Sequence, residues 1–284
     1  MTKNETLEKI KNLYKKYVAN STNPAWLKQK PEFFEYNPVT ALEETQPLKN
    51  AIASDTANHF EKILDIGSGK GILCIAFSNI AKEIIGLEPD KDAREIAELT
   101  KEYFEKDNVK FIDGIAQKMP FENEAFDLVV STSTLEHIDG TQNVIKEVFR
   151  VLKPNGYFYL NTPNYLWFRE PHYILPMFPL MPKIFLKMMA RMTNRNPKYI
   201  DHIQYLTPRF LNKILKSEGF TIKNISLESL NNTLFKNNVL NKNFIKKNVL
   251  HFLKLTRLNY LLYLFFKLTQ IYPHIIIIAR KNEE

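Results

Sequence analysis

The sequence predicts an α/β protein built on a parallel, doubly wound sheet. Two observations carry this prediction. Between residues 60 and 162, short apolar runs alternate with stretches of helical periodicity, and a cluster of glycines follows the first apolar run directly. The chain has 284 residues, of which 44% are hydrophobic, so it can bury one large core or two smaller ones.

Each expected strand is a short apolar run, and the expected helices between them carry helical spacing. The helix after the fourth strand ends at Pro154 and Gly156. A later helix begins with Thr207 as N-cap and Pro208 at its first position, and Gly219 ends it. The expected strands are 61–66, 82–90, 109–114, 125–132, 157–162, 221–227 and 273–281, and the expected helices are 71–80, 91–106, 141–156 and 207–219.

The chain is expected to have four parts. Residues 1–55 should form a helix, a proline-containing link and a second helix, and residues 56–162 should form the alternating core. Residues 163–205 are rich in proline, methionine and aromatic residues and have no strand pattern, so we expect an insert there. Residues 206–284 should complete the sheet and add basic amphipathic helices.

Charge is divided unevenly along the chain, although the formal net charge is +8. Residues 1–170 contain 21 Lys and Arg against 26 Asp and Glu, which gives −5. Residues 171–284 contain 18 against 5, which gives +13. This asymmetry indicates an anionic partner for one surface of the protein.

The cysteine count and the lengths of the apolar runs indicate the cellular compartment. The single cysteine, Cys74, excludes an intramolecular disulfide framework and a four-cysteine zinc site. The charged N-terminal run lacks the apolar stretch of a signal peptide, and no uncharged apolar run reaches the roughly 18 residues of a membrane span. We therefore expect a cytoplasmic protein.

The stretch ILDIGSGKG places glycines at positions 67, 69 and 71, where a ligand can approach the backbone closely. Glu88 follows Asp65 by 23 residues, and an acid about 20 residues on suits the two hydroxyls of a ribose. The spacing differs from the G-x-G-x-x-G of dinucleotide sites, and no Gly-Lys-Ser/Thr of a P-loop is present. A carboxylate at Asp65 suits an ammonium and a sulfonium better than a pyrophosphate. A tight turn without a ligand is the structural alternative.

At these residues the chain resembles the class I S-adenosylmethionine-dependent methyltransferases, and in particular the small-molecule enzymes of quinone biosynthesis. ILDIGSGKG and GLEPD resemble the family's first two motifs. MPFENEAFDLVVSTSTLEHI and LKPNGYFYLNTPN resemble its fourth and fifth strands with their flanking turns. The resemblance implies a Rossmann-like core at 56–162, a seven-stranded sheet in the order 3-2-1-4-5-7-6, and S-adenosylmethionine as cofactor.

The resemblance also implies which residues contact the cofactor. Asp65, Gly67 and Gly69 would line its methionine end, Glu88 would hold the ribose, and Pro89 or Asp90 would flank the adenine. The full implied set is Asp65, Gly67, Ser68, Gly69, Gly71, Glu88, Pro89, Asp113, Ala116, Gln117 and Ser131.

One position departs from the family's pattern. The Gly-Asp-Ala that usually follows the third strand is Gly114-Ile115-Ala116 here. The adenine contact is therefore expected from backbone groups near Ala116 and Gln117, with Asp113 as a compensating acid.

Three histidines are candidates for a general base, because methyl transfer to a hydroxyl releases a proton. His137 follows the fourth strand, beside the expected methyl position, and its alternative role is a structural turn cap. His172 and His202 bracket the insert. In one quinone-pathway branch, acids beside this first histidine bind a divalent metal. Glu136 matches that pattern, but Ser133 replaces the other carboxylate, so we predict no metal.

The insert is expected to cover the acceptor. A helix from Pro182 would carry one basic stripe and one apolar face, and 245–268 is a second stretch of this kind. Such helices suit an anionic bilayer or a lipid, whereas packing on the domain with solvated charges is the alternative. The stripe is Lys183, Lys187, Arg191 and Arg195, and the apolar face is Ile184, Phe185, Met188, Met189 and Met192.

Three functions follow from these patterns. The first is O-methylation of an amphiphilic small molecule, such as a lipid-linked sugar, a glycolipid or a prenylated ring, at the inner face of the membrane. The second is an RNA methyltransferase that uses the basic half. Against it, the fourth strand lacks the Asn/Asp-Pro-Pro-Tyr motif and the chain has no cysteine pair. The third is a non-catalytic or nicotinamide-binding protein. The sequence leaves the methylated atom open among oxygen, nitrogen and carbon.

Overall fold

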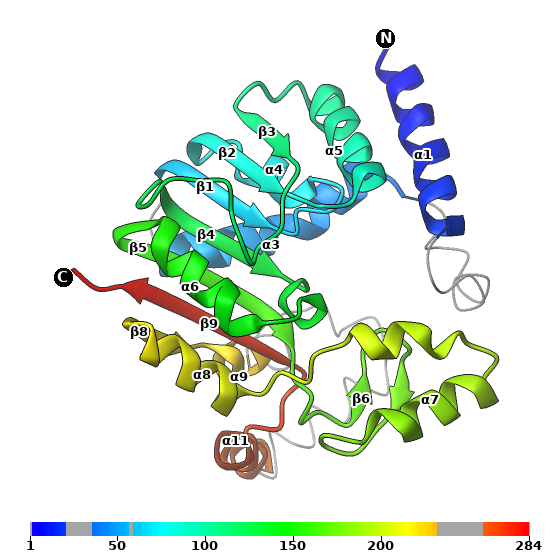
Figure 1. Cartoon of the computed structure of the whole chain (residues 1–284), viewed down its shortest axis with the longest axis vertical. Coiled ribbons are helices and arrows are strands. Elements are labelled where there is room, and N and C mark those ends of the chain that lie inside the picture. The colour runs from blue at the N-terminus through cyan, green and yellow to red at the C-terminus, as the bar shows by residue number, and fades with distance from the viewer. Residues whose placement is uncertain (1, 21–35, 57–58, 232–257, 284) are drawn as a thin grey trace.

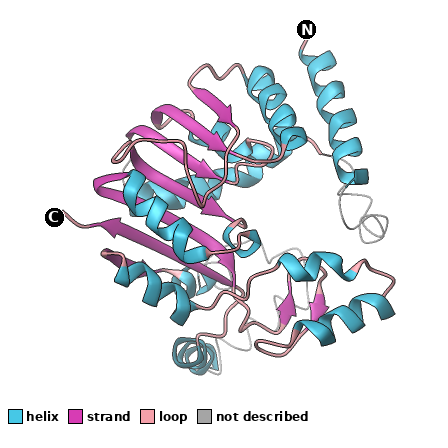
Figure 2. Cartoon of the chain, in the orientation of Figure 1, coloured by secondary structure: helices cyan, strands magenta, loops and turns pink. Residues whose placement is uncertain are grey.

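A seven-stranded sheet with helices on both faces forms the centre of the molecule (Figure 1; Figure 2). The computed structural model describes residues 2–20, 36–56, 59–231 and 258–283. The strand order is β3-β2-β1-β4-β5-β9-β8. When these strands are numbered along the chain, this is the predicted order 3-2-1-4-5-7-6, and the expected α/β fold is confirmed.

The elements of the sheet and its covering helices follow the predicted alternation. The strands are β1 (Phe60–Ile66), β2 (Ala81–Leu87), β3 (Val109–Ile112), β4 (Phe126–Thr132), β5 (Leu152–Pro163), β8 (Phe220–Asn224) and β9 (His274–Lys281). The helices are α1 (Lys3–Asn20), α3 (Pro38–Asp55), α4 (Ile72–Phe77), α5 (Lys91–Phe104), α6 (Thr141–Val151), α8 (Pro208–Ser217), α9 (Ser226–Asn231) and α11 (Leu258–Thr269).

The pairing of the strands fixes where a ligand can bind. β2 and β4 both pair with β1 in parallel, β3 pairs with β2, and β5 pairs with β4 in the same sense. β9 lies antiparallel between β5 and β8. The carboxyl ends of the first five strands therefore meet at one edge of the sheet, which is where open α/β sheets bind their ligands.

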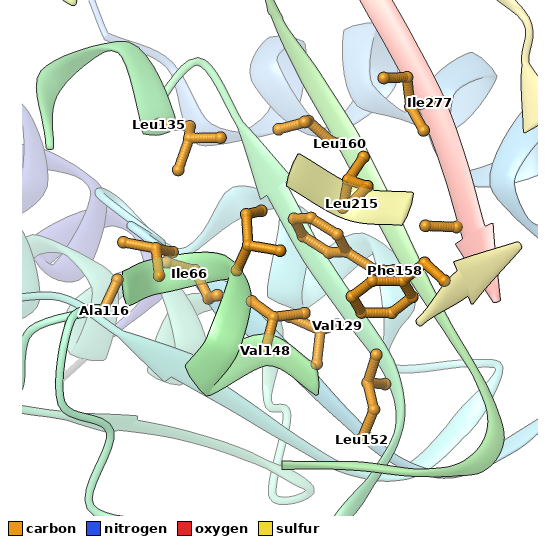
Figure 3. Packing of buried hydrophobic residues seen from close by; sticks show 14 of the residues in the cluster. Ile66, Ala116, Val129, Leu135, Val148, Leu152, Phe158, Leu160, Leu215 and Ile277 are labelled. Carbon is orange, nitrogen blue, oxygen red and sulfur yellow. The ribbon is translucent and has the colours of Figure 1, made fainter. Parts of the chain in front are cut away.

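Two hydrophobic clusters cover the two faces of the sheet, because alternate residues of a strand point to opposite sides. Ile66 of β1 packs in one cluster with Val148 of α6, Leu215 of α8 and Phe158 of β5 (Figure 3). Ile63 packs in the other cluster with residues of α3 and α4. Helices thus enclose the sheet on both sides, as a parallel sheet requires.

The insert folds as a small unit below one end of the sheet (Figure 1). It contains the strands β6 (Arg169–Glu170) and β7 (Leu175–Pro176), the helix α7 (Lys183–Met192) and a 3-10 helix, η3 (Pro197–His202). The sequence of the insert has no strand pattern, so the short β6–β7 pair was not expected. The insert has its own buried cluster, formed by Tyr165, Tyr173, Leu175, Met177, Met181, Leu186, Ala190, Ile200 and Ile203.

The structure corrects several local expectations. The helix expected at 141–156 ends at Val151, and Pro154 and Gly156 lie in β5. The strand expected at 221–227 ends at Asn224, because the Asn224 side chain accepts a hydrogen bond from the Ser226 N–H (3.0 Å) in a local turn and α9 begins there. Arg195 lies beyond the end of α7 and so does not extend the basic stripe along the helix. Met189 is half-buried against the insert's own cluster, and does not share the exposure of the other apolar residues of the helix.

The second basic stretch, 245–268, falls partly outside the described residues. Its described part lies in α11, where Leu262, Phe265 and Leu268 are exposed. Within the described ranges, every helix is too short or too polar to cross a bilayer.

Candidate functional site

The turn after β1 holds the backbone in a conformation that favours glycine. Gly67 has a φ of +69° and Gly69 a φ of +52°, in the left-handed region that other residues rarely adopt. A Cβ on Gly67 would lie 2.3 Å from the Thr134 side chain, so this position is closed to larger residues. A Cβ on Gly69 would meet no atom within 4 Å, so the backbone there faces open space. A ligand can approach at that point.

Glu88 joins the end of β2 to this turn. Its Oε2 accepts a hydrogen bond from the Gly69 N–H (2.9 Å), and its Oε1 accepts one from the Asp90 N–H (2.9 Å). Asp90 in turn caps α5 by accepting from the Ala93 N–H. Each oxygen of Glu88 retains acceptor capacity, because a carboxylate oxygen has two lone-pair directions. The carboxylate can therefore accept hydrogen bonds from a pair of hydroxyls while the backbone holds it in place.

A cavity of about 440 Å³ opens between this turn and the loops after β3 and β4. Its size is within the range of small-molecule sites. Six of the predicted site residues line it: Gly67, Glu88, Pro89, Ala116, Gln117 and His137. The other lining residues are Tyr17, Ile66, Leu87, Gly114, Ile115, Ser133, Thr134 and Ile138.

Other predicted cofactor residues support the turn or lie away from the cavity lining. Ser68 and Ser131 are buried. Gly71 is the residue before α4, and a Cβ there would lie 2.3 Å from the Phe111 ring. The Asp113 side chain is 74% exposed and pairs with Arg94 at 2.8 Å. Ala116 and Gln117 line the cavity and Asp113 does not, so the expected adenine contact from the backbone near Ala116 and Gln117 stays a prediction.

Asp65 lies beneath the turn. It is 2% exposed, and its carboxylate accepts a hydrogen bond from the Cys74 Sγ at 3.4 Å. Burial raises the pKa of Asp65 to about 7, and the hydrogen bond from Cys74 opposes this effect only in part. Near neutral pH a cation beside Asp65 would therefore favour its ionised form.

Of the three candidate histidines, His137 lines the cavity. His137 ends a 3-10 helix, η2 (Leu135–His137), directly after β4. Its ring packs edge-on against the His172 ring, with 4.8 Å between centroids, and its Nε2 lies 3.1 Å from the Tyr199 hydroxyl. Burial lowers the pKa of His137 to about 4, with the charges of His172 and His202 as smaller causes. His137 is therefore neutral near pH 7.

Two buried carboxylates support this histidine pair. Glu170 is fully buried, and its Oε1 lies 2.7 Å from His172 Nδ1, which leaves Nε2 as the free nitrogen of that ring. Glu136 is also fully buried and accepts a hydrogen bond from the Thr162 hydroxyl (2.9 Å) through Oε2. Among the described residues, its Oε1 has no hydrogen-bond partner. His202, by contrast, is exposed at the end of η3.

Glu136, His137 and His172 together could hold a divalent cation. Glu136, His137 and His172 each offer one ligand atom, and these atoms lie within 4.8 Å of one another. One carboxylate and two imidazoles are a common ligand set for transition metals. The sequence predicts no metal at this position, and that expectation stays a prediction that removal of metal can test.

Sequence reasoning missed Tyr17, Glu170 and Tyr199. Glu170 precedes His172 by two residues, and this short spacing could have indicated an acid beside the histidine. Tyr17 lies 50 residues before the first glycine of the turn, and Tyr199 lies 62 residues after His137. A single sequence contains no local signal for such distant partners.

Asp65→Asn is expected to flatten the pH dependence of the free energy of unfolding. The folded-state pKa of Asp65, about 7, lies above the ordinary 3.8. The stability that protonated Asp65 contributes is therefore fully present below pH 3.8 and is lost as pH rises through 7. At about 1.4 kcal/mol per pKa unit, this loss is on the order of 4 kcal/mol. Urea unfolding followed by circular dichroism over this pH range measures it.

Asp113→Asn is the matched control, because that side chain is exposed. If the free energy of unfolding of Asp65→Asn kept the wild-type slope between about pH 5 and about pH 8, the buried carboxylate would not be the source of that pH dependence.

Comparison with known proteins identifies the family. The model of a methyltransferase domain matches residues 28–225. The uncharacterized methyltransferase YcgJ of Bacillus subtilis is 32% identical over 139 residues, which are 49% of this chain and 54% of that one, so the match spans about half of the relative. A ubiquinone biosynthesis O-methyltransferase of Pseudomonas fluorescens is 28% identical over 190 residues, covering 65% of this chain and 75% of that one.

Solved structures share the fold. The crystal structure of YcgJ has a TM-score of 0.54 and 20% identity, covering 85% of this chain and 100% of that chain. Phosphoethanolamine N-methyltransferase 2 of Haemonchus contortus, in complex with S-adenosyl-L-methionine, has a TM-score of 0.52 and 18% identity, covering 84% of this chain and 53% of that chain. The open backbone at Gly69 and the anchored Glu88 carboxylate fit this cofactor. The protein therefore belongs to the S-adenosylmethionine-dependent methyltransferases of the methyltransferase-domain family.

Proposed function

We propose that this protein methylates a hydroxyl oxygen of an amphiphilic small molecule, such as a lipid-linked sugar, a glycolipid or a prenylated ring. The observation that carries the proposal is one cavity lined by both Glu88 and His137, with the half-buried His172 ring packed against His137. A relative named as a ubiquinone biosynthesis O-methyltransferase supports a small-molecule acceptor.

The cofactor end of the cavity positions the methyl donor. S-adenosylmethionine supplies an activated methyl group on a positively charged sulfur. Glu88 would accept hydrogen bonds from the ribose hydroxyls, and Gly67 and Gly69 would allow the backbone to approach the ligand. Asp65, beneath the turn, would favour positive charge on the ligand. Holding donor and acceptor in contact supplies much of the rate in such a displacement.

The histidine end is suited to remove a proton from the acceptor. Because burial keeps His137 neutral near pH 7, one of its ring nitrogens can accept a hydrogen bond from the acceptor hydroxyl. The proton would move from the hydroxyl to that nitrogen and then on to His172, whose ring packs against His137 and whose Nδ1 faces the buried Glu170 carboxylate. Glu170 thus orients His172 and compensates its charge, and the proton then passes to solvent.

An amphiphilic acceptor is supported by the surface of the insert. Ile184 and Met192 of α7 are 70% and 78% exposed, and Phe185 and Met188 beside them are also exposed. Lys187 pairs with Asp201, which neutralises its charge, so Lys183 and Arg191 of α7 are the basic neighbours of this apolar surface. An exposed apolar helix face with basic neighbours, in the half of the chain that carries the positive charge, suits contact with an anionic lipid surface.

Labelled methyl groups test the proposal directly. We expect the protein to transfer label from S-adenosylmethionine into the organic phase of a total extract from the source cell. The Glu88→Ala variant should lose most of this transfer because it cannot hold the ribose. Label in the RNA fraction instead would favour the RNA methyltransferase, and label only in water-soluble small molecules would contradict the amphiphilic acceptor.

The His172→Ala and Glu170→Gln variants are expected to lower the initial rate of label transfer into the lipid extract. A general base contributes about 10²–10⁴-fold, so a loss of this size is expected for His172→Ala. Affinity for S-adenosylhomocysteine should stay unchanged, because neither residue lines the cofactor end. His59→Ala, at an exposed position, is the matched control.

The same label-transfer assay, with EDTA added, tests the expectation that no metal is needed. We expect EDTA to leave the rate of label transfer unchanged. A loss that added magnesium or zinc restores would mean that Glu136, His137 and His172 hold a cation. An unchanged rate in His172→Ala would contradict the role of the histidine pair.

Flotation with phosphatidylglycerol vesicles at low salt tests the lipid contact. The wild-type protein should float, and a variant with Ile184→Glu and Met192→Glu should float less, because both exposed side chains would then repel the surface. Phe210→Glu is the control, since Phe210 is exposed on α8. A wild-type protein that stays with the unbound fraction would contradict the lipid contact and leave methyl transfer itself untouched.

A further inference from the structure

The N-terminal helix α1 packs beside α5 at the edge of the molecule (Figure 1). Ile10, Tyr14 and Val18 of α1 are buried against Ile96 and Leu99 of α5. A helix in this position need have no role beyond covering α5. Two contacts with the cofactor site indicate a more specific role.

The first contact involves Lys70, which lies between the last two glycines of the turn. Its Nζ is 4.7 Å from the centroid of the Tyr14 ring and 4.4 Å from that of the Tyr36 ring. Within the described residues, no carboxylate lies within ion-pair distance of this ammonium. Burial lowers the pKa of Lys70 to about 8, so the side chain is mostly protonated at neutral pH. The two rings are therefore the main electrostatic partners of the cation.

The second contact is Tyr17, one helical turn after Tyr14. Tyr17 lines the cavity together with Gly67, Glu88 and Pro89. Burial, followed by the negative charges of Asp90 and Glu88, raises the pKa of Tyr17 to about 12. The phenol therefore keeps its proton and can act as a hydrogen-bond donor at the end of the cavity where Glu88 lies.

We propose that α1 is a cap on the cofactor cavity, in which Tyr17 contacts the cofactor and Lys70, held between Tyr14 and Tyr36, couples the glycine turn to the cap. This inference rests on the proposed cofactor site. Because Tyr17 and the turn line the same cavity, ligand binding and docking of α1 stabilise each other, and this coupling is reciprocal. Tyr17 is a binding residue, and Lys70 is a positioning residue that acts through α1.

Calorimetry of the full chain with S-adenosylhomocysteine tests the cap. Tyr17→Ala and Lys70→Met are each expected to raise the dissociation constant about tenfold, which corresponds to about 1.4 kcal/mol. Lys70→Arg should restore most of the affinity, because a guanidinium also stacks on aromatic rings. Tyr263→Ala on α11 and Lys146→Met on α6 are matched controls at exposed positions.

Hydrogen exchange gives an independent readout of the coupling. In the wild-type protein, S-adenosylhomocysteine should slow exchange in residues 3–20, and in Lys70→Met this protection should be largely lost. Wild-type binding with no added protection of α1, together with unchanged affinity in Tyr17→Ala, would overturn the cap and leave the methyltransferase assignment intact. If the wild-type protein did not bind the ligand at all, the proposed function would fail with it.

Discussion

The hydrogen bond between the Gly69 N–H and the Glu88 carboxylate is the contact on which the site depends. It joins the turn after β1 to the end of β2, two neighbouring parallel strands whose carboxyl ends meet at the same edge. It requires a left-handed turn after β1, and it requires an acid directly after the last residue of β2. The same carboxylate faces the cavity and is held there by a second backbone N–H, from Asp90. A ligand therefore meets an acceptor group that is already oriented.

The two ends of the cavity are built in different ways. Apart from Tyr17 of α1, the cofactor end consists of short segments that directly follow β1, β2 and β3, so the sheet itself fixes the positions of these segments. The histidine end depends on contacts between distant segments: His137 follows β4, whereas His172, Glu170 and Tyr199 come from the insert. Changes in the insert can alter the acceptor end while the glycine turn keeps its shape. This division suits a family in which one cofactor serves many acceptors.

Much of the fold and the cofactor end could be predicted from local patterns. Apolar runs, the glycine spacing and the acid at Glu88 are local features, and the structure agrees with them because the strands of a parallel sheet repeat the same βα unit. Side-chain direction was not predictable: Asp65 was expected to line the methionine end, yet its carboxylate points to Cys74 beneath the turn. Glu170 had a local signal in its spacing of two residues from His172, whereas Tyr17 could not be placed at the cavity without the packing of α1 on α5.

The position of Glu88 in a complex is the most direct test of the cofactor site. A crystal structure with S-adenosylhomocysteine measures it, since the ligand has the same ribose and adenine as the methyl donor. We expect both ribose hydroxyls within hydrogen-bond distance of the Glu88 carboxylate, and the ligand's sulfur directed toward His137. A ligand bound elsewhere, or a Glu88 side chain turned away from the ribose, would contradict the central claim.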